Sequence, residues 1–334
     1  KLDEAKARLE EIGANLVACD DELLPRQERN LEAALGVPVI ARTAVILDIF
    51  ADHAHSADGK LQVELAQLEY NLARMRGLWT HLERLGAGIG TRGPGESQIE
   101  TDRRLARDRI AALRRRLRGV EQNRGVMRSR RQDTSLPQVA LAGYTNAGKS
   151  TLLNALTGVD SVSVGDRLFH TLDPTTRAYE YEGRRYLITD TVGFIEKLPH
   201  QLVEAFKATL EETVLSDLIL HVVDASSSRE KMAAEMAAAD SVLEEIGAGD
   251  KPRLLVLNKI DLLDAEERGE VRLNRPDAIQ VSAVTGEGLD RLRAEVERTF
   301  EPQLSSDAAA PRRARWQEAL SRAGDWEEHS TVKS

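Results

Sequence analysis

Residues 143–150 read GYTNAGKS and fit the phosphate-loop pattern GxxxxGK[ST]. The loop follows an apolar strand pattern and opens a helical one, so backbone N–H groups and the helix N-terminus can surround phosphate oxygens. In such a loop Lys149 reaches the β- and γ-phosphates, and Ser150 ligates Mg²⁺. The sequence therefore predicts a nucleoside-triphosphate site. Its residues are Gly143, Tyr144, Thr145, Asn146, Ala147, Gly148, Lys149, Ser150 and the following Thr151.

A second motif, Asn258-Lys259-Ile260-Asp261, indicates which base the site accepts. The carboxylate of Asp261 can accept two hydrogen bonds from guanine, one from N1–H and one from the exocyclic amine. Adenine has neither donor, so its binding would leave the carboxylate buried and unpaired. Ser282-Ala283, after the next strand, is placed to offer a backbone N–H to guanine O6. The two motifs together predict a site for GTP and GDP.

The segments DTVGF and TLDPTTR, which lie between these motifs, are predicted to close over the γ-phosphate and Mg²⁺. Asp190 is expected to hold Mg²⁺ through water, and Gly193 to donate its N–H to the γ-phosphate. We assign to Thr176 the hydroxyl and carbonyl that close over the metal when triphosphate orders the loop, with Thr175 as the alternative. The predicted magnesium ligands are Ser150, Thr176 and Asp190.

Phe194 follows the glycine of DTVGF and raises a question about hydrolysis. In the best-known GTP-hydrolysing domains this residue is a glutamine that orients the attacking water. A phenyl ring can neither donate nor accept such a hydrogen bond. Either the domain binds nucleotide without cleaving it, or another group completes the site.

The elements that must position these motifs alternate between apolar strands and amphipathic helices over residues 137–300. This alternation predicts an α/β fold, a P-loop GTPase (G) domain with a mostly parallel sheet. Tyr179–Glu180 and the EGRR turn predict one antiparallel hairpin at the sheet edge. Residues 301–334 are predicted to form a flexible C-terminal tail with one short helix around Trp316.

Residues 1–60 are predicted to form a partial small α/β N-terminal domain. LDEAKARLEEIGA and DDELLPRQERNLEAALG have helical patterns, the second with a stop at Gly36. VPVIAR and VILDIF are short β-branched runs, which are typical of strands.

Residues 61–131 carry two apolar heptad series, which predict an antiparallel helical hairpin with the apolar stripes buried against each other. The first series is Leu61, Leu65, Leu68, Leu72, Met75, Trp79 and Leu82, and the second is Ala106, Ile110, Leu113, Leu117 and Val120. The tip, GAGIGTRGPGE at 86–96, has five glycines and a proline, so we expect irregular structure there. Arg92 in this tip is a candidate contact with a partner.

The net charge of −9 conceals a strong segregation of charge. Residues 101–131 hold twelve arginines against three acidic residues, which makes this segment +9 and the remainder −18. Such asymmetry indicates a nucleic-acid partner. Arg107, Arg114 and Arg118 are spaced to lie near one helical face and are the candidate contacts.

No apolar run approaches the roughly 18 residues of a membrane-spanning helix, and the start of the chain does not resemble a signal peptide. The single cysteine, Cys19, excludes an intramolecular disulfide and a cysteine-based metal cluster. We therefore expect a monomeric cytoplasmic enzyme, with peripheral membrane association as the alternative.

The NxGKS loop, the PTTR segment and the apolar residue after DxxG resemble those of the GTPases related to Era and Obg. The tip GTRGPGESQIE and the preceding GKLQVELAQLEYNLARMRG narrow this resemblance to the HflX family, over about residues 20–300. The resemblance implies a ribosome-associated GTPase that binds the large subunit and its rRNA and can separate the subunits of stalled ribosomes. It also implies that the hairpin carries its tip toward the peptidyl transferase centre.

The resemblance also suggests an answer to the question of Phe194. In related GTPases with an apolar residue there, an asparagine of the phosphate loop helps to hold K⁺ beside the phosphates, and Asn146 occupies that place. We expect slow intrinsic turnover that K⁺ and the ribosome stimulate. The alternative role of Asn146 is a turn-stabilising amide. The expected catalytic residues are Asn146, Lys149, Thr176 and Gly193.

The chain departs from the family pattern at its ends. The family has more sequence ahead of the residue that is Lys1 here, and its usual C-terminal domain is not recognisable in residues 301–334. Two other functions stay open: a regulatory switch that signals to proteins with the hairpin as a coiled-coil adaptor, and an RNA-binding factor in ribosome assembly.

Overall fold

The computed structural model describes residues 1–75, 94–132, 136–158, 174–195 and 210–300. The chain divides into two units, Lys1–Asp290 and Arg291–Ser334. The predicted tail, 301–334, lies outside the described residues, and so do residues 86–93 of the predicted tip with Arg92. None of the described helices is long and apolar enough to cross a membrane.

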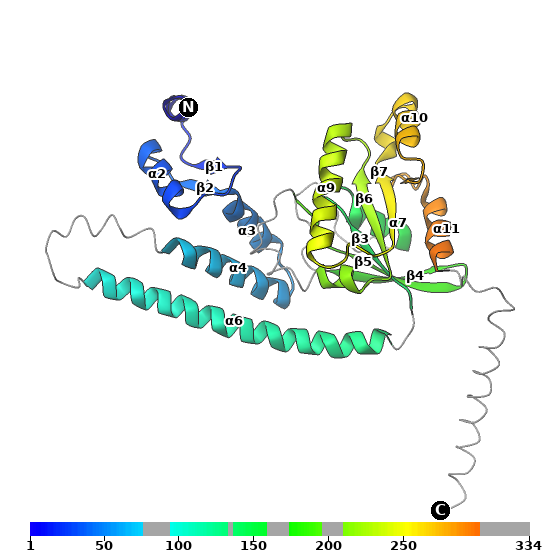
Figure 1. Ribbon diagram of the computed structural model, residues 1–334, viewed down its shortest axis with the longest axis horizontal. Helices are drawn as coiled ribbons and strands as arrows, with labels where there is room; N and C mark the ends of the chain where they lie inside the picture. The colour runs from blue at the N-terminus through cyan, green and yellow to red at the C-terminus, as the bar shows by residue number, and fades with distance from the viewer. Residues whose placement is uncertain (76–93, 133–135, 159–173, 196–209, 301–334) are drawn as a thin grey trace, which may run out of the picture. The chain divides into compact units, whose positions relative to one another are not determined.

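The N-terminal residues form a small α/β piece around two parallel strands (Figure 1). Its first elements are α1 (Leu2–Ile12), β1 (Val17–Cys19), α2 (Pro25–Leu35) and β2 (Val39–Ala41). α2 has its proline in the first helical position, where the missing N–H costs nothing. It ends before Gly36, whose φ is 76, which confirms the predicted stop.

The prediction of a strand at VILDIF is wrong, because this run lies within helix α3 (Arg42–His53). Its buried positions are Thr43, Ile46, Leu47 and Phe50, spaced by three, one and three residues. That spacing places the four side chains on one face of a helix, whereas a strand would bury every second residue. The β-branched preference of the run is weak and yields to this packing pattern.

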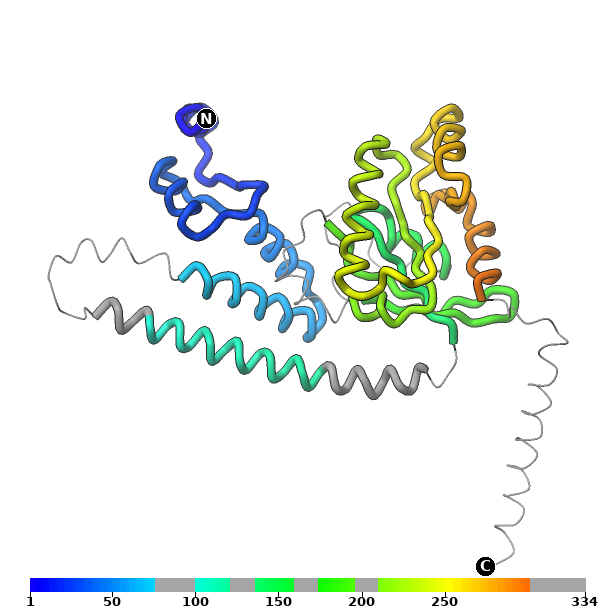
Figure 2. The backbone as a smooth tube through the Cα atoms, in the orientation of Figure 1, coloured from blue at the N-terminus to red at the C-terminus, as the bar shows by residue number. Residues whose placement is uncertain are grey.

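Helices α4 (Ala57–Met75) and α6 (Pro94–Gln132) form the predicted antiparallel hairpin (Figures 1 and 2). Their shared apolar cluster consists of Leu61, Leu65, Leu68 and Leu72 from the first helix and Ile110, Leu113 and Leu117 from the second. These residues belong to the two predicted heptad series, which confirms the apolar seam. The predicted irregular tip extended to residue 96, but α6 already begins at Pro94, since proline is well tolerated at a helix start.

The G domain contains a six-stranded sheet with the order β4-β5-β3-β6-β7-β8. The strands are β3 (Gln138–Ala142), β4 (Thr175–Tyr181), β5 (Arg184–Asp190), β6 (Leu218–Asp224), β7 (Arg253–Asn258) and β8 (Ile279–Gln280). All neighbours pair in parallel except β4 and β5, which form an antiparallel hairpin at the edge through a two-residue turn. The predicted mostly parallel sheet and its edge hairpin are both confirmed.

Helices cover both faces of this sheet, with α9 in front of the strands and α7 behind them in Figure 1. The helices of the domain are α7 (Lys149–Thr157), α9 (Arg229–Glu245), α10 (Ala265–Asn274) and α11 (Leu289–Thr299), with the short 3-10 helix η1 (Ile260–Leu262). Strands β3, β5, β6 and β7 run in one direction. The loops after their carboxyl ends therefore meet along one edge, where open α/β sheets bind their ligands.

His221 in β6 is buried at the centre of the sheet, and its Nε2 has no hydrogen-bond partner among the described residues. Burial lowers the pKa of His221 to about 4; the negative charge of Asp240 opposes this shift, while Arg253 and Lys149 add to it. The histidine is therefore neutral in the folded protein at pH 5–7, whereas in the unfolded chain it titrates near its ordinary value of about 6.5.

Because the unfolded chain takes up this proton first, we expect stability to fall as the pH drops from 6.5 toward 4. The contribution of His221 to this loss is about 2 kcal/mol by pH 5 and roughly 3 kcal/mol at its full extent. Denaturant unfolding of a His221→Leu variant should accordingly show a flatter pH dependence between 6.5 and 4.5. His55→Leu, at an exposed position, serves as the control, and an equal slope in both variants would exclude this role of His221.

Candidate guanine-nucleotide site

The predicted phosphate loop joins the end of β3 to the start of α7, so its backbone N–H groups converge at the N-terminus of that helix. Gly148 directly precedes α7 and has a φ of 88, a conformation that strains other residues. A Cβ at this position would lie 2.3 Å from Nδ2 of Asn258. Glycine is therefore required at 148 by the backbone conformation and by its neighbour.

Lys149 is buried in this loop, with its Nζ 3.1 Å from the carbonyl oxygen of Gly143 and 2.9 Å from that of Tyr144. Burial lowers the pKa of Lys149 to about 8, and the charge of Asp190 opposes the shift. Phosphate oxygens carry more negative charge than carbonyls, so a phosphate group placed here would stabilise the ammonium form. Lys149 is thus positioned for the phosphate contact that the motif predicts.

Ser150 and Asp190 form a pair of oxygen ligands beside this lysine. The hydroxyl of Ser150 donates a hydrogen bond of 2.6 Å to Oδ2 of Asp190, whose residue is completely buried at the end of β5. Magnesium prefers carboxylate, hydroxyl and water oxygens, and Asp190 supplies negative charge where water has little access. The two residues therefore fit a magnesium ion, which would offset charge on bound phosphates.

Thr175 and Thr176, the two candidates for the threonine that closes over the metal ion, are the first residues of β4. Thr175 lies opposite Asp190 in the β4–β5 pairing, whereas Thr176 lies opposite Thr189. The hydroxyls of Thr176 and Thr189 are 3.0 Å apart. Because directly opposed residues share one face of a sheet, Thr175 lies on the face of Asp190 and Thr176 on the other. In this conformation Thr176 is therefore not gathered with the other magnesium ligands, and its assignment stays a prediction.

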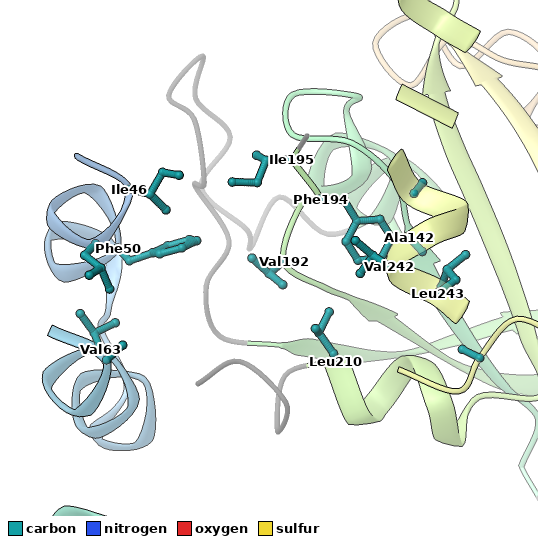
Figure 3. Packing of buried hydrophobic residues seen from close by; sticks show 14 of the residues in the cluster. Ile46, Phe50, Val63, Ala142, Val192, Phe194, Ile195, Leu210, Val242 and Leu243 are labelled. Atoms are coloured by element: carbon teal, nitrogen blue, oxygen red, sulfur yellow. The ribbon is translucent and has the colours of Figure 1, made fainter. Parts of the chain in front are cut away.

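Phe194 is almost fully buried and packs beside Ala142, Val242 and Leu243 (Figure 3). Its N–H donates to the carbonyl of Gly143 at 3.0 Å, and its own carbonyl accepts from the N–H of Thr145 at 2.9 Å. These two bonds hold DTVGF against the phosphate loop. The side chain of Phe194 is thus a core residue, which leaves the orientation of water to another group.

Gly193 lies close to the phosphate loop. A Cβ on this residue would be 2.8 Å from Cα of Thr145 and 3.0 Å from Nζ of Lys149. Only glycine allows this approach, so the N–H of residue 193 can come near a γ-phosphate held by Lys149. The geometry agrees with the contact assigned to Gly193.

Asn258 ties the base-binding segments to the phosphate loop. Its Nδ2 donates to the carbonyl of Ala147 at 2.9 Å, and its Oδ1 accepts from the N–H of Ala283 at 3.0 Å. The N–H of Ser282 donates to the carbonyl of Glu287 at 2.9 Å. Both N–H groups of the predicted guanine O6 contact are thus engaged within the protein, and that assignment stays a prediction.

Asp261 follows within η1, and its Oδ1 is buried without a hydrogen-bond partner among the described residues. A buried carboxylate oxygen without a donor is costly unless a ligand supplies one. Guanine offers two donors in the geometry that a carboxylate accepts, and adenine offers none there. This oxygen is therefore available to accept a hydrogen bond from guanine, as the sequence predicts for Asp261.

A second candidate site is a groove of about 460 Å³ on the hairpin, which we call the arginine groove. Its lining residues are Arg107, Arg114, Arg115, Arg118, Glu69, Leu72, Ile110 and Ala111. The three predicted contacts therefore share one groove, but Arg114 donates to Glu69 at 2.8 Å and is partly neutralised. Arg115 also lines the groove, and the sequence reasoning misses it because helical spacing alone takes no account of the opposite helix.

The remaining predicted residues lie around the nucleotide site. Gly143, Tyr144, Thr145, Asn146, Ala147 and Gly148 form the loop, Lys149, Ser150 and Thr151 begin α7, Asn258 ends β7, and Lys259 and Asp261 follow it. The sequence reasoning misses Asp224 at the end of β6, although a polar residue after an apolar strand at this sheet edge is a detectable signal.

Three family descriptions match consecutive parts of the chain. "GTP-binding GTPase N-terminal" matches residues 1–51, "GTP-binding GTPase Middle Region" matches residues 53–131, and "50S ribosome-binding GTPase" matches residues 138–259.

Curated relatives extend over most of the chain. A protein from Caldanaerobacter subterraneus subsp. tengcongensis named GTPase HflX is 52% identical over 299 residues, which are 89% of this chain and 68% of that protein. The Escherichia coli protein named GTPase HflX is 50% identical over 283 residues, 84% of this chain and 66% of its own. The chain thus spans about two thirds of the length of these relatives.

A solved structure agrees in fold. The crystal structure of SsGBP in complex with GDP has a TM-score of 0.50 and 26% identity, and the match covers 89% of this chain and 84% of that one. The identity to proteins named GTPase HflX and the match to the GTPase family descriptions show that the chain belongs to the HflX family of ribosome-associated GTPases and hydrolyses GTP.

Proposed function

We propose that this GTPase binds the large ribosomal subunit through its helical hairpin and promotes the splitting or rescue of stalled ribosomes, with GTP governing docking and release. The observation that carries the proposal is the arginine groove. Arg107, Arg115 and Arg118 line it and form no ion pair with an acidic side chain that the structure describes. Guanidinium groups in such a groove suit the phosphates of rRNA. The description "50S ribosome-binding GTPase" agrees with this partner.

The hairpin is built to present this groove rigidly. Arg109 donates to Glu64 at 2.9 and 2.7 Å, and Arg114 pairs with Glu69, so two ion pairs join the helices beside the apolar seam. Each exposed pair contributes little stability, about 0.2–1 kcal/mol, in addition to the apolar seam that joins the helices. A partner that binds the groove therefore contacts a preformed surface.

Arg74, in the last turn of α4 on the side of the hairpin tip, joins the hairpin to the N-terminal elements. Its guanidinium pairs with Glu28 at 3.0 Å, donates to the carbonyl of Leu23 at 3.1 Å and lies 3.3 Å from the ring centroid of Tyr70. Both members of the ion pair are mostly buried. These contacts hold α4 against α2.

In the proposed cycle, Lys149 and the loop N–H groups bind the phosphates, while Ser150 and Asp190 hold Mg²⁺. Phe194 cannot orient water, so the remaining stabilisation is expected from K⁺ at Asn146 and from the docked ribosome. Asn146 has a φ of 61, and its exposed amide has no hydrogen-bond partner among the described residues. This exposure favours an ion ligand over a turn-stabilising amide.

Replacing Na⁺ by K⁺ is expected to raise GTP turnover roughly tenfold, because a cation at Asn146 would offset charge that develops between the β- and γ-phosphates. Asn146→Ala should remove this gain and largely retain nucleotide affinity. Phosphate release measured in both salts tests the expectation, with Asn30→Ala, at an exposed position of α2, as the control. Equal rates of the unaltered protein in Na⁺ and K⁺ would argue against the cation.

The ribosome proposal is tested by sedimentation with purified ribosomal subunits in the presence of GDP or a non-hydrolysable GTP analogue. Co-sedimentation with the large subunit in the analogue, and release in GDP, is the expected result. Equal binding in GDP and in the GTP analogue would favour the alternative function of a ribosome-assembly factor. Absence of binding to either subunit would favour the switch that signals to proteins.

A further inference from the structure

Asp224 closes β6 directly beside the base-binding motif. It is the register partner of Asn258 in the parallel pairing of β6 with β7, and the carbonyl of Asn258 accepts the N–H of Ala225 at 2.9 Å. Oδ2 of Asp224 accepts from Nζ of Lys259 at 2.7 Å. Its Oδ1 accepts from the N–H of Ser226 at 2.9 Å and from the hydroxyl of Ser226 at 2.6 Å. Both carboxylate oxygens thus accept hydrogen bonds: Oδ1 from Ser226 in the turn after β6, and Oδ2 from Lys259.

This ion pair is more enclosed than the surface pairs of the protein. The side chains of Lys259 and Asp224 are 22% and 17% exposed, whereas those of Arg185 and Glu180 in the edge hairpin are 71% and 61% exposed. Burial raises the pKa of Asp224, but hydrogen bonds from Lys259 and Ser226 outweigh it and the pKa is lowered. The carboxylate therefore stays charged at neutral pH and holds the ammonium electrostatically.

The backbone of Lys259 shows why such an anchor matters. Lys259 has a φ of 66, a left-handed conformation that costs a residue with a side chain roughly 1 kcal/mol. Its neighbours are fixed, since Asn258 bridges the phosphate loop to Ala283 and Asp261 presents the buried acceptor to the base. Lys259 and Ile260 lie between these two residues, and Ile260 is buried in the core, so Lys259 has the side chain that is available to a base bound at Asp261.

We propose that Asp224 is a positioning residue for guanine nucleotides, which holds Lys259 so that the lysine stem covers one face of the bound base. The four methylene groups of a lysine can cover an aromatic surface while the ammonium remains paired at its end. The proposal concerns the GTP site itself and does not depend on the ribosome as partner.

The substitution Asp224→Asn tests this role, because its amide oxygen can still accept from Ser226 while the charge that holds Lys259 is lost. We expect the Kd of GDP and the KM of GTP to rise about five- to tenfold, the range for loss of a partly exposed charge-assisted hydrogen bond. The kcat at saturating GTP should change little, because the base contact is the same in the ground and transition states. Asp240→Asn is the matched control. Asp240 forms an ion pair of 2.6 Å with Arg253, and this pair lies outside the base-binding motif.

A double-mutant cycle with Lys259→Met separates positioning from a general structural role. If Asp224 acts through Lys259, then Asp224→Asn should weaken binding little further in the Lys259→Met background. Additive losses would overturn the proposal, and so would an unchanged or tighter Kd in Asp224→Asn. Ser226→Ala removes the hydroxyl hydrogen bond to Oδ1 of Asp224 and keeps the backbone bond and the ion pair, so a loss as large as that of Asp224→Asn would assign the effect to the turn instead. If Asp224→Asn does not fold, Lys259→Met breaks the same ion pair from the other side, and an unchanged Kd of GDP in that variant would overturn the proposal.

Discussion

Asp261→Asn is expected to weaken GTP binding at least a hundredfold and to raise the affinity for the xanthine nucleotide. The carboxylate of Asp261 has a buried oxygen without a partner among the described residues, so guanine donors are its natural complement. An asparagine places an amide donor against the amine of guanine, two donors facing each other. Xanthine carries a carbonyl oxygen in place of that amine, which accepts from the asparagine.

Titration of both nucleotides against the variant measures this exchange. Asp264→Asn is the matched control, because the same substitution three residues later alters only the cap of α10, where Asp264 accepts from the N–H groups of Glu266 and Glu267 at 2.9 Å. Asparagine is an equally good N-cap, so GTP affinity should be kept there. An unchanged GTP affinity in Asp261→Asn would remove this residue from base recognition.

The glycines of the candidate nucleotide site could be predicted from the sequence because backbone geometry dictates them. Gly148 has a left-handed φ, and a Cβ there would lie 2.3 Å from Asn258. Gly193 has similarly close neighbours, so both glycines are fixed by the space around them. Lys149 and Asp190 are charged residues at buried positions, where a phosphate and a metal ion would add to the hydrogen bonds that the protein gives them. Motifs of this kind can be predicted because the interactions that require each residue type involve only a few residues of sequence.

Other features depend on contacts between segments distant in the sequence. The run VILDIF has strand-forming residues, yet Ile46, Leu47 and Phe50 are buried on one face of α3 because tertiary packing decides the period. Helical spacing groups Arg114 with Arg107 and Arg118, which have no acidic partner among the described side chains, but the partner of Arg114, Glu69, lies 45 residues earlier on the other helix. Asp224 reaches Lys259 only because β6 and β7 are neighbours in the sheet. No spacing within one segment could indicate these pairs.

Phe194 shows how the two kinds of information combine. The sequence indicates that this residue cannot orient water, and the structure shows its ring in the core with its backbone bonded to Gly143 and Thr145. Motion of DTVGF away from the phosphate loop would therefore have to break two hydrogen bonds and expose an aromatic ring. We expect the segment to stay in place during turnover, and the activating group to approach from outside it.

Reversal of Arg107, Arg115 and Arg118 to glutamate is expected to weaken binding to the large ribosomal subunit at least a hundredfold at moderate salt. These residues line the arginine groove without an acidic partner among the described side chains, so their charge is available to rRNA phosphates. Each lost phosphate contact also removes about 0.7–0.9 from the slope of log affinity against log salt. The slope should therefore become shallower by two to three, while basal GTP turnover is retained because the nucleotide motifs are untouched.

The control must carry the same change in net charge, since a more acidic protein is repelled by RNA wherever the charge lies. Arg26, Arg184 and Arg272 are exposed and lie outside the hairpin, so their reversal to glutamate supplies it. This control should lose little affinity, because screening over a distance of about 10 Å limits the effect of remote charges at moderate salt. Equal losses in the two triple variants would show that net charge alone drives association. Equal affinity and an equal salt slope in the groove variant would make the hairpin a solvated strut, and the ribosome contact would then have to lie on another surface.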